Sequence, residues 1–362
     1  FVLAISPFNF TAIGGNLPSA PAMMGNVVVW KPASTSVLAN YYFMRILEEA
    51  GLPKGVINFV PSRGSQVSEV VLTDPRMAGF HFTGSTSTFQ TIWKTVGENI
   101  TNYQSYPRLV GETGGKDFVF AHETAQADKV VANLVRGAFE YQGQKCSAAS
   151  RAYIPASMWE KVKAGLLEET AKLKVGDVRN FTNFMGAVID KAAFDSIASY
   201  IDYAKASEEA EIIAGGTYDD SVGYFVQPTI IVTTNPNFKT MVEEIFGPVL
   251  TIYVYENNKL EETLDSLDTA SMYALTGSIF AQDRQAILHL ERRLSGAAGN
   301  FYINDKPTGA MINQQPFGGS RGSGTNDKAG SVFNMVRWTS PRVIKENFAP
   351  TTDIAYPFMD EE

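Results

Sequence analysis

Short apolar segments alternate with segments of helical period between residues 1 and 99, and this alternation restricts the fold more than any other feature. The apolar segments predict strands at 1–5, 27–30, 55–60 and 77–82. The periodic segments predict helices at 35–50, 65–72 and 86–99. On the first of these helices, one face is expected to carry Leu38, Tyr42, Ile46 and Leu47. Strands and helices in this order are typical of a parallel sheet with right-handed crossovers.

The same alternation continues after Gly115, which predicts a second α/β domain in this chain of 362 residues. Helices are predicted at 128–141, 157–173, 260–267 and 284–294. Strands are predicted at 151–154, 225–232, 249–255 and 277–280. Because no low-complexity linker separates the two parts, we place the boundary between them near Gly114 and Gly115.

Composition excludes several classes of protein. The chain has 38 acidic and 30 basic residues and no basic run, so no nucleic-acid partner is expected. One cysteine excludes an internal disulfide, and three scattered histidines form no zinc motif, so no metal is expected. The opening apolar run is too short to cross a membrane, and no membrane partner is expected. Because that run begins at Phe1 as a buried strand, we expect a piece of a longer protein that is poorly stable alone.

The only cysteine, Cys146, lies in a polar turn with a glycine at residues 142–147. A lone cysteine is most often core packing, but these polar neighbours favour a nucleophile. Lys145 is expected to lower the pKa of the thiol if its side chain faces the sulfur. Glu112, 34 residues earlier in a glycine-containing run, is either a solvated turn residue or a mobile general base. A thiol and a carboxylate are the minimum needed to form and hydrolyse a thioester.

Three further motifs each permit two interpretations. Asn9 follows the opening strand and is either a turn residue or a donor to an oxyanion. Residues 82–87 end a strand and begin a helix, where small hydroxyl side chains serve as caps or as an anion site for a pyrophosphate. Phe246 and Phe317, each followed by glycine, are either surface residues or walls of a ligand pocket.

In this order, and with the spacing between Glu112 and Cys146, the motifs resemble the NAD(P)-dependent aldehyde dehydrogenase superfamily over nearly the whole chain. Within it, the chain is most similar to the 1-pyrroline-5-carboxylate dehydrogenases, also called L-glutamate γ-semialdehyde dehydrogenases. This narrower similarity is carried by residues 6–11, 139–148, 299–306, 314–319 and 324–328. The resemblance implies two α/β domains with parallel-rich sheets, the first lacking its N-terminal part. It divides the chain into an NAD-binding domain (1–114), a catalytic domain (115–318) and a segment that returns to the first domain and to subunit contacts (319–362).

The resemblance also implies a mechanism. Cys146 would attack an aldehyde, with the Asn9 amide and the Cys146 backbone N–H stabilising the oxyanion, and Glu112 would activate the water that releases the product. The reaction implied is oxidation of L-glutamate γ-semialdehyde to L-glutamate in proline catabolism. Two alternatives stay open: an aldehyde dehydrogenase of another substrate range, and a catalytically silent scaffold with this fold.

The resemblance assigns binding roles to further residues. The cofactor would contact Ser6, Lys31, Gly84, Ser85, Thr86, Ser87, Thr88, Glu244 and Phe246. The aldehyde would contact Phe10, Ser147, Gly309, Ala310 and Phe317. Many relatives carry a ribose-binding glutamate where Ser34 stands, and its absence removes a group that would repel the 2′-phosphate of NADP. NAD is the expected cofactor, and NADP is not excluded. Some relatives carry serine where Ala310 stands, so a hydroxyl contact to the substrate is missing here. The resemblance also implies a homodimer or higher homo-oligomer, in which residues 341–347 supply an edge strand for subunit pairing. The implied location is the mitochondrial matrix in a eukaryote or the cytoplasm in a bacterium.

Overall fold

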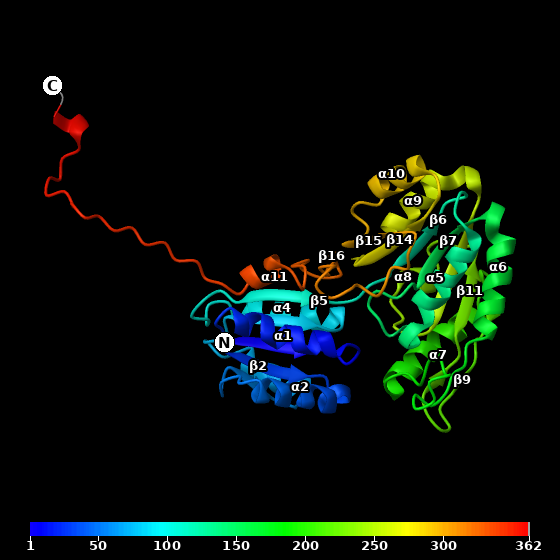
Figure 1. The fold of residues 1–362 in the computed structure, drawn as a ribbon, viewed down its shortest axis with the longest axis horizontal. Helices are drawn as coiled ribbons and strands as arrows, with labels where there is room; N and C mark the ends of the chain where they lie inside the picture. Colours follow the sequence, from blue (N-terminus) through cyan, green and yellow to red (C-terminus); the bar gives the residue numbers. More distant parts are fainter. Residues whose placement is uncertain (361–362) are drawn as a thin grey trace.

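Five strands form a parallel sheet in the first third of the chain, and a second sheet lies beside it (Figure 1). The computed structural model describes residues 1–360. In spatial order, the strands of the first sheet are β3 (Ile57–Phe59), β2 (Val28–Pro32), β1 (Val2–Ser6), β4 (Gly79–Thr83) and β5 (Arg108–Glu112). Every neighbouring pair is parallel, so the carboxyl ends of the strands meet at one edge of the sheet.

Helices cover both faces of this sheet, which explains why its strands are apolar on both sides. The helices are α1 (Thr11–Met23), α2 (Val37–Glu49), α3 (Gly64–Val71) and α4 (Thr86–Glu98). Leu17 of α1 and Met44 of α2 belong to the core on one face. Val67 of α3 and Phe89 of α4 belong to the core on the other face.

Helix α1 is absent from the sequence-based expectations because it contains Pro18, Pro21 and two glycines, residue types that usually break helices. Packing explains one of the glycines. A Cβ at Gly14 would collide with the side chain of Asn40 on α2, so the close contact of the two helices requires glycine there.

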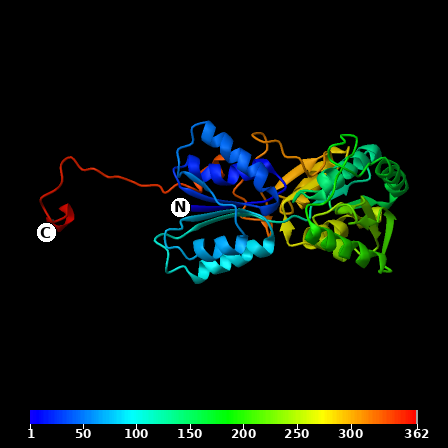
Figure 2. The ribbon, with the colours of Figure 1, turned by 90° about the horizontal axis from the view of Figure 1, so that it is seen from below.

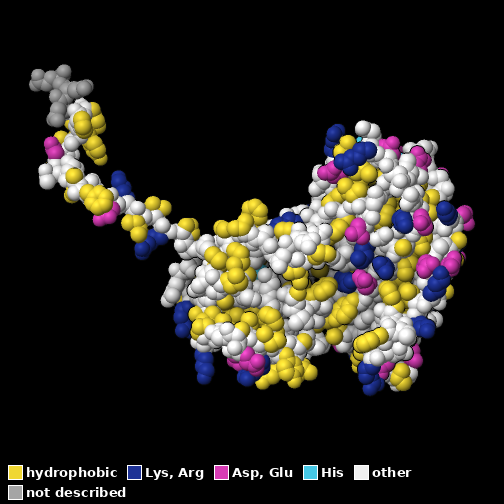
Figure 3. Space-filling view, viewed as in Figure 1, with side chains coloured by type: hydrophobic (Ala, Val, Ile, Leu, Met, Phe, Trp, Pro, Cys, Tyr) yellow, Lys and Arg dark blue, Asp and Glu magenta, His cyan; other side chains and the backbone are white. Residues whose placement is uncertain are grey.

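The apolar face expected on α2 does not pack as a whole against the sheet, although Leu47 contacts the core. Leu38, Tyr42 and Ile46 are 69%, 61% and 61% exposed, whereas Asn40 is buried. The side-chain N–H of Asn40 donates a hydrogen bond of 2.9 Å to the backbone carbonyl of Ser36, whereas its Oδ1 has no hydrogen-bond partner within residues 1–360. Hydrophobic side chains are accordingly visible at the surface of this part of the molecule (Figure 3). Periodicity locates an apolar stripe on a helix but does not say which stripe meets the sheet.

The second sheet has seven strands, and its parallel pairs outnumber the single antiparallel pair. In spatial order they are β15 (Asn300–Ile303), β14 (Thr276–Phe280), β6 (Phe118–Ala121), β7 (Arg151–Pro155), β12 (Val249–Tyr255), β11 (Thr229–Thr233) and the antiparallel β8 (Ala210–Ala214). The helices are α5 (Ala127–Phe139), α6 (Ala156–Ala171), α7 (Lys191–Lys205), α9 (Leu260–Thr269) and α10 (Arg284–Arg293). Helices α5 and α6 pack on one face and α7, α9 and α10 on the other. The predicted α/β class is therefore confirmed.

The strand predicted at 225–232 is wrong as one element. It consists of β10 (Phe225–Val226), which pairs with β9 (Tyr218–Asp219), and of β11, with Pro228 between them. Proline has no N–H to continue a ladder, and this explains the break. The remaining short elements are α8 (Lys239–Val242), β13 (Tyr273–Ala274), β16 (Ser320–Arg321), α11 (Val332–Val336) and single helical turns at Ser34–Ser36, Glu140–Gly143, Asn257–Lys259 and Pro357–Asp360.

After β15 the chain returns to the first sheet. Trp338, just past α11, is buried against Val2 and Val110, and the guanidinium of Arg108 donates to the backbone carbonyl of Thr339. Residues 340–359 then run away from the body as an extended, exposed tail (Figures 1 and 2). Within residues 1–360, no helix is both long enough and apolar enough to cross a membrane.

Candidate active site

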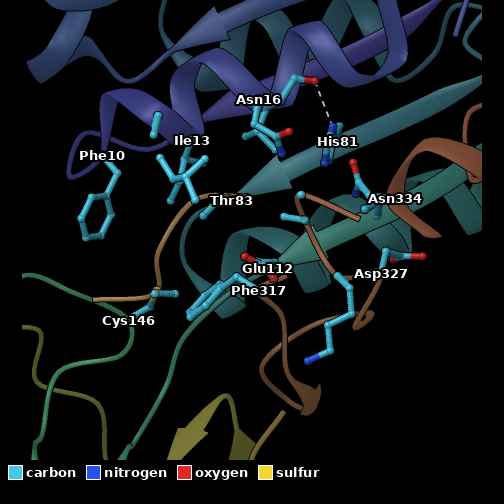
Figure 4. Close-up of a pocket in the computed structure, with 18 of the residues that line it drawn as sticks. Phe10, Ile13, Asn16, His81, Thr83, Glu112, Cys146, Phe317, Asp327 and Asn334 are labelled. Atoms are coloured by element: carbon cyan, nitrogen blue, oxygen red, sulfur yellow. Dashed lines mark hydrogen bonds between the residues drawn. The ribbon is translucent and has the colours of Figure 1, made fainter. Parts of the chain in front are cut away.

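Cys146 and Glu112 both line a cavity of about 400 Å³. Its wall comes from α1, the ends of β4 and β5, the loop that carries Cys146, and the segments 309–317 and 325–334. The cavity is also lined by every residue predicted to contact the aldehyde, namely Phe10, Ser147, Gly309, Ala310 and Phe317. In the view of Figure 4, the Phe317 side chain lies between those of Cys146 and Glu112.

The loop before Cys146 has an unusual backbone. Tyr141, Gln142 and Gly143 have φ values of 55°, 57° and 64°, in the left-handed region that side chains disfavour. The Gln142 amide donates to the carbonyl of Ala187 at 3.1 Å, and its oxygen accepts from the N–H of Gly186 at 3.1 Å. These two bonds hold the strained turn, which is a feature often found at functional sites.

The Cys146 side chain is protected from solvent and has an acidic neighbourhood. The residue is 7% exposed. Burial raises the pKa of the Cys146 thiol well above its usual range, and the negative charges of Glu112, Asp117 and Glu244 raise it further. The expectation that Lys145 lowers this pKa is wrong, because its ammonium donates to the Glu140 carboxylate at 2.7 Å.

Glu112 is the last residue of β5, at the edge where the strands of the first sheet end. Its Oε1 is buried and has no hydrogen-bond partner within residues 1–360. Burial raises the pKa of Glu112 to about 8, the charge of Lys328 lowers it, and that of Asp327 raises it. A carboxyl group with a pKa this close to neutral suits general-base chemistry. The alternative of a solvated turn residue is wrong.

Asn9 does not line the cavity but contacts the loop that precedes Cys146. It is buried, and its side-chain N–H donates to the backbone carbonyl of Gln144 at 3.0 Å. An asparagine amide carries two donors, so one N–H is left for a second acceptor near Cys146.

The residues predicted to contact the cofactor gather elsewhere, and none of them lines the cavity. Ser6, Lys31 and the run 84–88 lie at or just after the carboxyl ends of β1, β2 and β4. The Ser6 hydroxyl accepts from the indole N–H of Trp30 at 2.9 Å, and burial lowers the pKa of Lys31. Ser85 is the N-cap of α4, accepting from the N–H of Thr88 at 3.3 Å.

Glu244 and Phe246 lie beside the segment that links the two sheets. Glu244 Oε1 accepts from the N–H of Gly115 at 2.9 Å, and burial raises the pKa of Glu244 to about 7. A Cβ at Gly114 would collide with the same carboxylate, so the chain passes close to it. Phe246 has a φ of 58°, and its ring meets the ring of Phe8 edge to face at 6.0 Å.

Three buried charged residues near the cysteine loop have no role in the sequence-based predictions. Lys116, Asp117 and Arg151 are each buried, and the Arg151 guanidinium donates to the carbonyl of Lys116 at 2.8 Å. Burial lowers the pKa of Lys116 to about 7. Their only signal in the sequence is the position of Lys116 and Asp117 directly after two glycines. In the described part of the chain, no cluster of His, Cys, Asp and Glu is arranged to hold a metal.

The sequence profile of the aldehyde dehydrogenase family matches residues 1–344. The chain belongs to the aldehyde dehydrogenase family. This membership confirms the predicted superfamily, and the fold described above is the fold of that family.

Named relatives show which branch of the family this aldehyde dehydrogenase is similar to. A mitochondrial delta-1-pyrroline-5-carboxylate dehydrogenase of Dictyostelium discoideum is 59% identical over 361 residues, covering 99% of this chain and 65% of the relative. The human mitochondrial protein of the same name is 51% identical, with 99% of this chain and 64% of the relative covered. This chain therefore spans about two thirds of the length of these curated relatives.

Solved structures of the same branch of the family are also similar to this chain. The Delta-pyrroline-5-carboxylate dehydrogenase of Mycobacterium tuberculosis, solved with NAD bound, is 56% identical with a TM-score of 0.94, covering 99% of this chain and 66% of that one. A 1-pyrroline-5-carboxylate dehydrogenase mutant of Thermus thermophilus is 34% identical with a TM-score of 0.87, covering 93% and 64%. The predicted resemblance to this branch is confirmed.

Proposed function

We propose that the protein oxidises L-glutamate γ-semialdehyde to L-glutamate with NAD, a step of proline catabolism. The observation that carries this proposal is that Cys146 and Glu112 line the same cavity. Relatives at 51–59% identity named as 1-pyrroline-5-carboxylate dehydrogenases support the choice of substrate. A volume of about 400 Å³ fits an amino-acid aldehyde.

The first half of the reaction is covalent attack. The Cys146 thiol passes its proton to water, the sulfur forms a bond to the aldehyde carbon, and the carbonyl electrons move to oxygen as a thiohemiacetal oxyanion. The free N–H of Asn9 and the backbone N–H of Cys146 stabilise that oxyanion. When bound, the nicotinamide supplies the two-electron acceptor that turns this adduct into a thioester.

The second half is hydrolysis by Glu112. Its buried carboxylate takes a proton from water, and the water oxygen attacks the thioester carbon. The carbon–sulfur bond then breaks, which releases the carboxylate product and restores the Cys146 thiolate. Glu112 lines the same cavity as Cys146, on the far side of Phe317 in the view of Figure 4.

The residues at the sheet edge fit a dinucleotide. The N-terminus of the 13-residue helix α4, with Ser85, Thr86 and Ser87, offers unpaired N–H groups and hydroxyls to a pyrophosphate. The half-buried carboxylate of Glu244 suits ribose hydroxyls, and the buried Lys31 suits the adenosine ribose. Ser34 carries no charge that would repel the 2′-phosphate of NADP. The assay of cofactor reduction is therefore run with NADP as well as with NAD.

The substrate's own amino-acid group would lie at the far side from the sulfur. Gly309 has a φ of 87° and precedes Ala310, and backbone N–H groups of such a turn suit a carboxylate. Phe10 and Phe317 flank the aliphatic chain. Ser147 lies against Thr308, with their hydroxyl oxygens 2.8 Å apart.

We also propose the organisation and surroundings of the enzyme. Residues 1–114, 115–318 and 319–362 serve as cofactor domain, catalytic domain and returning segment. The exposed apolar tail supports assembly as a homodimer or higher homo-oligomer. The mitochondrial relatives support the matrix for a eukaryotic source, with the cytoplasm proposed for a bacterial one.

An assay of NADH release tests the function. Full-length protein with the semialdehyde should produce NADH faster than with simple aliphatic aldehydes, and Cys146→Ala should produce none. Faster turnover of aliphatic aldehydes would point to another substrate range. No NADH from any aldehyde, together with no labelling of Cys146 by iodoacetamide, would favour a silent scaffold.

A further inference from the structure

Lys328 lines the cavity of Cys146 and Glu112, and the fold ties its loop to the strand that carries Glu112. The N–H of Thr325 donates to the carbonyl of Gly111 at 2.9 Å, and the N–H of Gly111 donates back to the Thr325 hydroxyl at 3.0 Å. A Cβ at Gly324 would collide with the Gly111 carbonyl. The loop therefore has a fixed place beside β5.

Uncharged acceptors hold the Lys328 ammonium. It donates to the carbonyls of Gly299 at 2.7 Å and Gly318 at 2.8 Å, and to Asn300 Oδ1 at 3.3 Å. These bonds fix the direction of the side chain without cancelling its charge. Lys328 itself has a φ of 51°, so the backbone is also held in a disfavoured region to present this side chain.

Gly318 lies between Lys328 and Glu112. Its carbonyl accepts from the ammonium, and a Cβ on it would come within 3.0 Å of Glu112 Oε1. Oε1 has no hydrogen-bond partner within residues 1–360, so Glu112 depends on charge rather than on a contact for stabilisation of its ionised form.

We propose that Lys328 is a positioning residue whose charge favours the ionised form of Glu112, the form that activates water. The proposal rests on the function proposed above. Groups of both signs surround the carboxylate: Lys328 and Asp327 come from the same loop, and the Cys146 thiol faces it from the cysteine loop. Asp327 is itself paired with the guanidinium of Arg337 at 2.9 Å, so its removal also leaves that positive charge unpaired. The positive charge of Lys328 lowers the pKa of Glu112, and the negative charge of Asp327 raises it.

An ester substrate isolates the step at which Glu112 acts. p-Nitrophenyl acetate transfers its acetyl group to the Cys146 sulfur and releases p-nitrophenol as a burst, and the steady rate then reports hydrolysis of the thioester. The reaction is followed at the isosbestic wavelength of nitrophenol and nitrophenolate, so pH does not alter the signal. It needs no cofactor and no semialdehyde.

The pH profile of the steady rate tests the proposal. Lys328→Met should move the rising limb upward by about one pH unit, because an opposite charge at close range lowers a carboxyl pKa by about that amount or more. Lys328→Arg should keep the limb in place. Lys94→Met, on the exposed surface of α4, is the matched control and should behave as the unaltered protein.

Two further variants keep the test decisive. In a Glu112→Gln background, Lys328→Met should have no additional effect on the profile. Asp327→Asn removes the opposing charge and should move the limb downward, which decides the question if Lys328→Met does not melt cooperatively. An unchanged limb in a folded Lys328→Met protein, or an unchanged or raised limb in Asp327→Asn, overturns the proposal.

The same assay separates this inference from the proposed function. A normal burst and a Lys328-dependent profile without NADH from the semialdehyde would contradict the assigned substrate and support Lys328. Absence of any burst in the unaltered protein would contradict both.

Discussion

The side-chain amide of Asn9 donates a hydrogen bond of 3.0 Å to the backbone carbonyl of Gln144, two residues before Cys146. Asn9 follows β1 of the first sheet, and Gln144 belongs to a loop of the second. The contact therefore links the two sheets at the nucleophile. It also directs the remaining N–H of the amide, because the two donors of one planar group have a fixed angle between them.

Asn9→Ala should lower kcat by roughly 100- to 1000-fold, the usual effect of losing one oxyanion donor. The measurement is the rate of NADH release under saturating substrate. Alkylation of Cys146 by iodoacetamide forms no oxyanion, so its rate should change little. A large fall in alkylation would instead show that Asn9 acts only by placing the cysteine loop.

Glu112→Gln should increase the reactivity of the Cys146 thiol toward iodoacetamide above pH 8. The negative charge of Glu112 raises the pKa of this thiol, so its removal increases the thiolate fraction. A shift of one pKa unit would give about a tenfold faster reaction. Because the chain has one cysteine, Cys146→Ala provides the blank. Equal alkylation rates for both proteins at pH 9 would contradict the electrostatic contact.

Much of the fold was predictable from sequence because buried strands are short apolar runs between turn residues. Strands β1, β2, β4 and β7 fall where such runs occur. Helix α1 was not, because its prolines and glycines are acceptable only against the partner helix that packs on them. The buried face of α2 also depends on a neighbour, since Asn40 lies against Gly14 of α1, a contact between helices that the sequence does not display.

The candidate site follows the same division. Cys146 and Glu112 could be selected from sequence because a thiol and a carboxylate in glycine-containing turns carry chemistry by residue type. The direction of Lys145 could not, since its pairing with Glu140 depends on how the turn folds. The approach of Lys328 to Glu112 spans more than 200 residues and appears only once the loop is tied to β5.

Gln142→Ala should reduce the free energy of unfolding by about 1–3 kcal/mol, because a buried side chain loses two hydrogen bonds and leaves the N–H of Gly186 unpaired. Gln142→Gly loses the same bonds but adopts a φ of 57° without a Cβ, so it should be about 1 kcal/mol more stable than the alanine variant. Urea unfolding of the pair measures the difference. An alanine variant as stable as the glycine variant would mean that the turn is unstrained.

Ala310→Ser should lower KM for the semialdehyde and leave kcat nearly unchanged. The residue lines the cavity, and a hydroxyl there would add one hydrogen bond to the substrate carboxylate. A net contribution of about 1 kcal/mol corresponds to roughly a fivefold change in KM. A small aliphatic aldehyde has no carboxylate and serves as the control substrate. An equal change for both substrates would place the head group elsewhere.

His81 should make the protein less stable in mild acid. Its ring is buried against Trp338 at 4.9 Å, and Nδ1 lies 2.9 Å from the Leu17 carbonyl. Burial lowers the pKa of His81 to about 4, whereas the same side chain in the unfolded chain has a pKa near 6.5. Below pH 6.5 the unfolded state therefore binds a proton that the folded state refuses. Stability is fully present above pH 6.5 and is lost as pH falls toward 4.

The expected loss from this one group is about 2 kcal/mol between pH 7 and pH 5, measured as the free energy of unfolding in urea. His81→Gln should weaken the pH dependence by that amount, even if the variant is less stable at pH 7, because glutamine does not titrate. His122→Gln is the matched control, since His122 is only partly buried, and it should retain the dependence of the unaltered protein. If His81→Gln and His122→Gln have the same slope of stability against pH, the acid sensitivity does not come from the His81 ring.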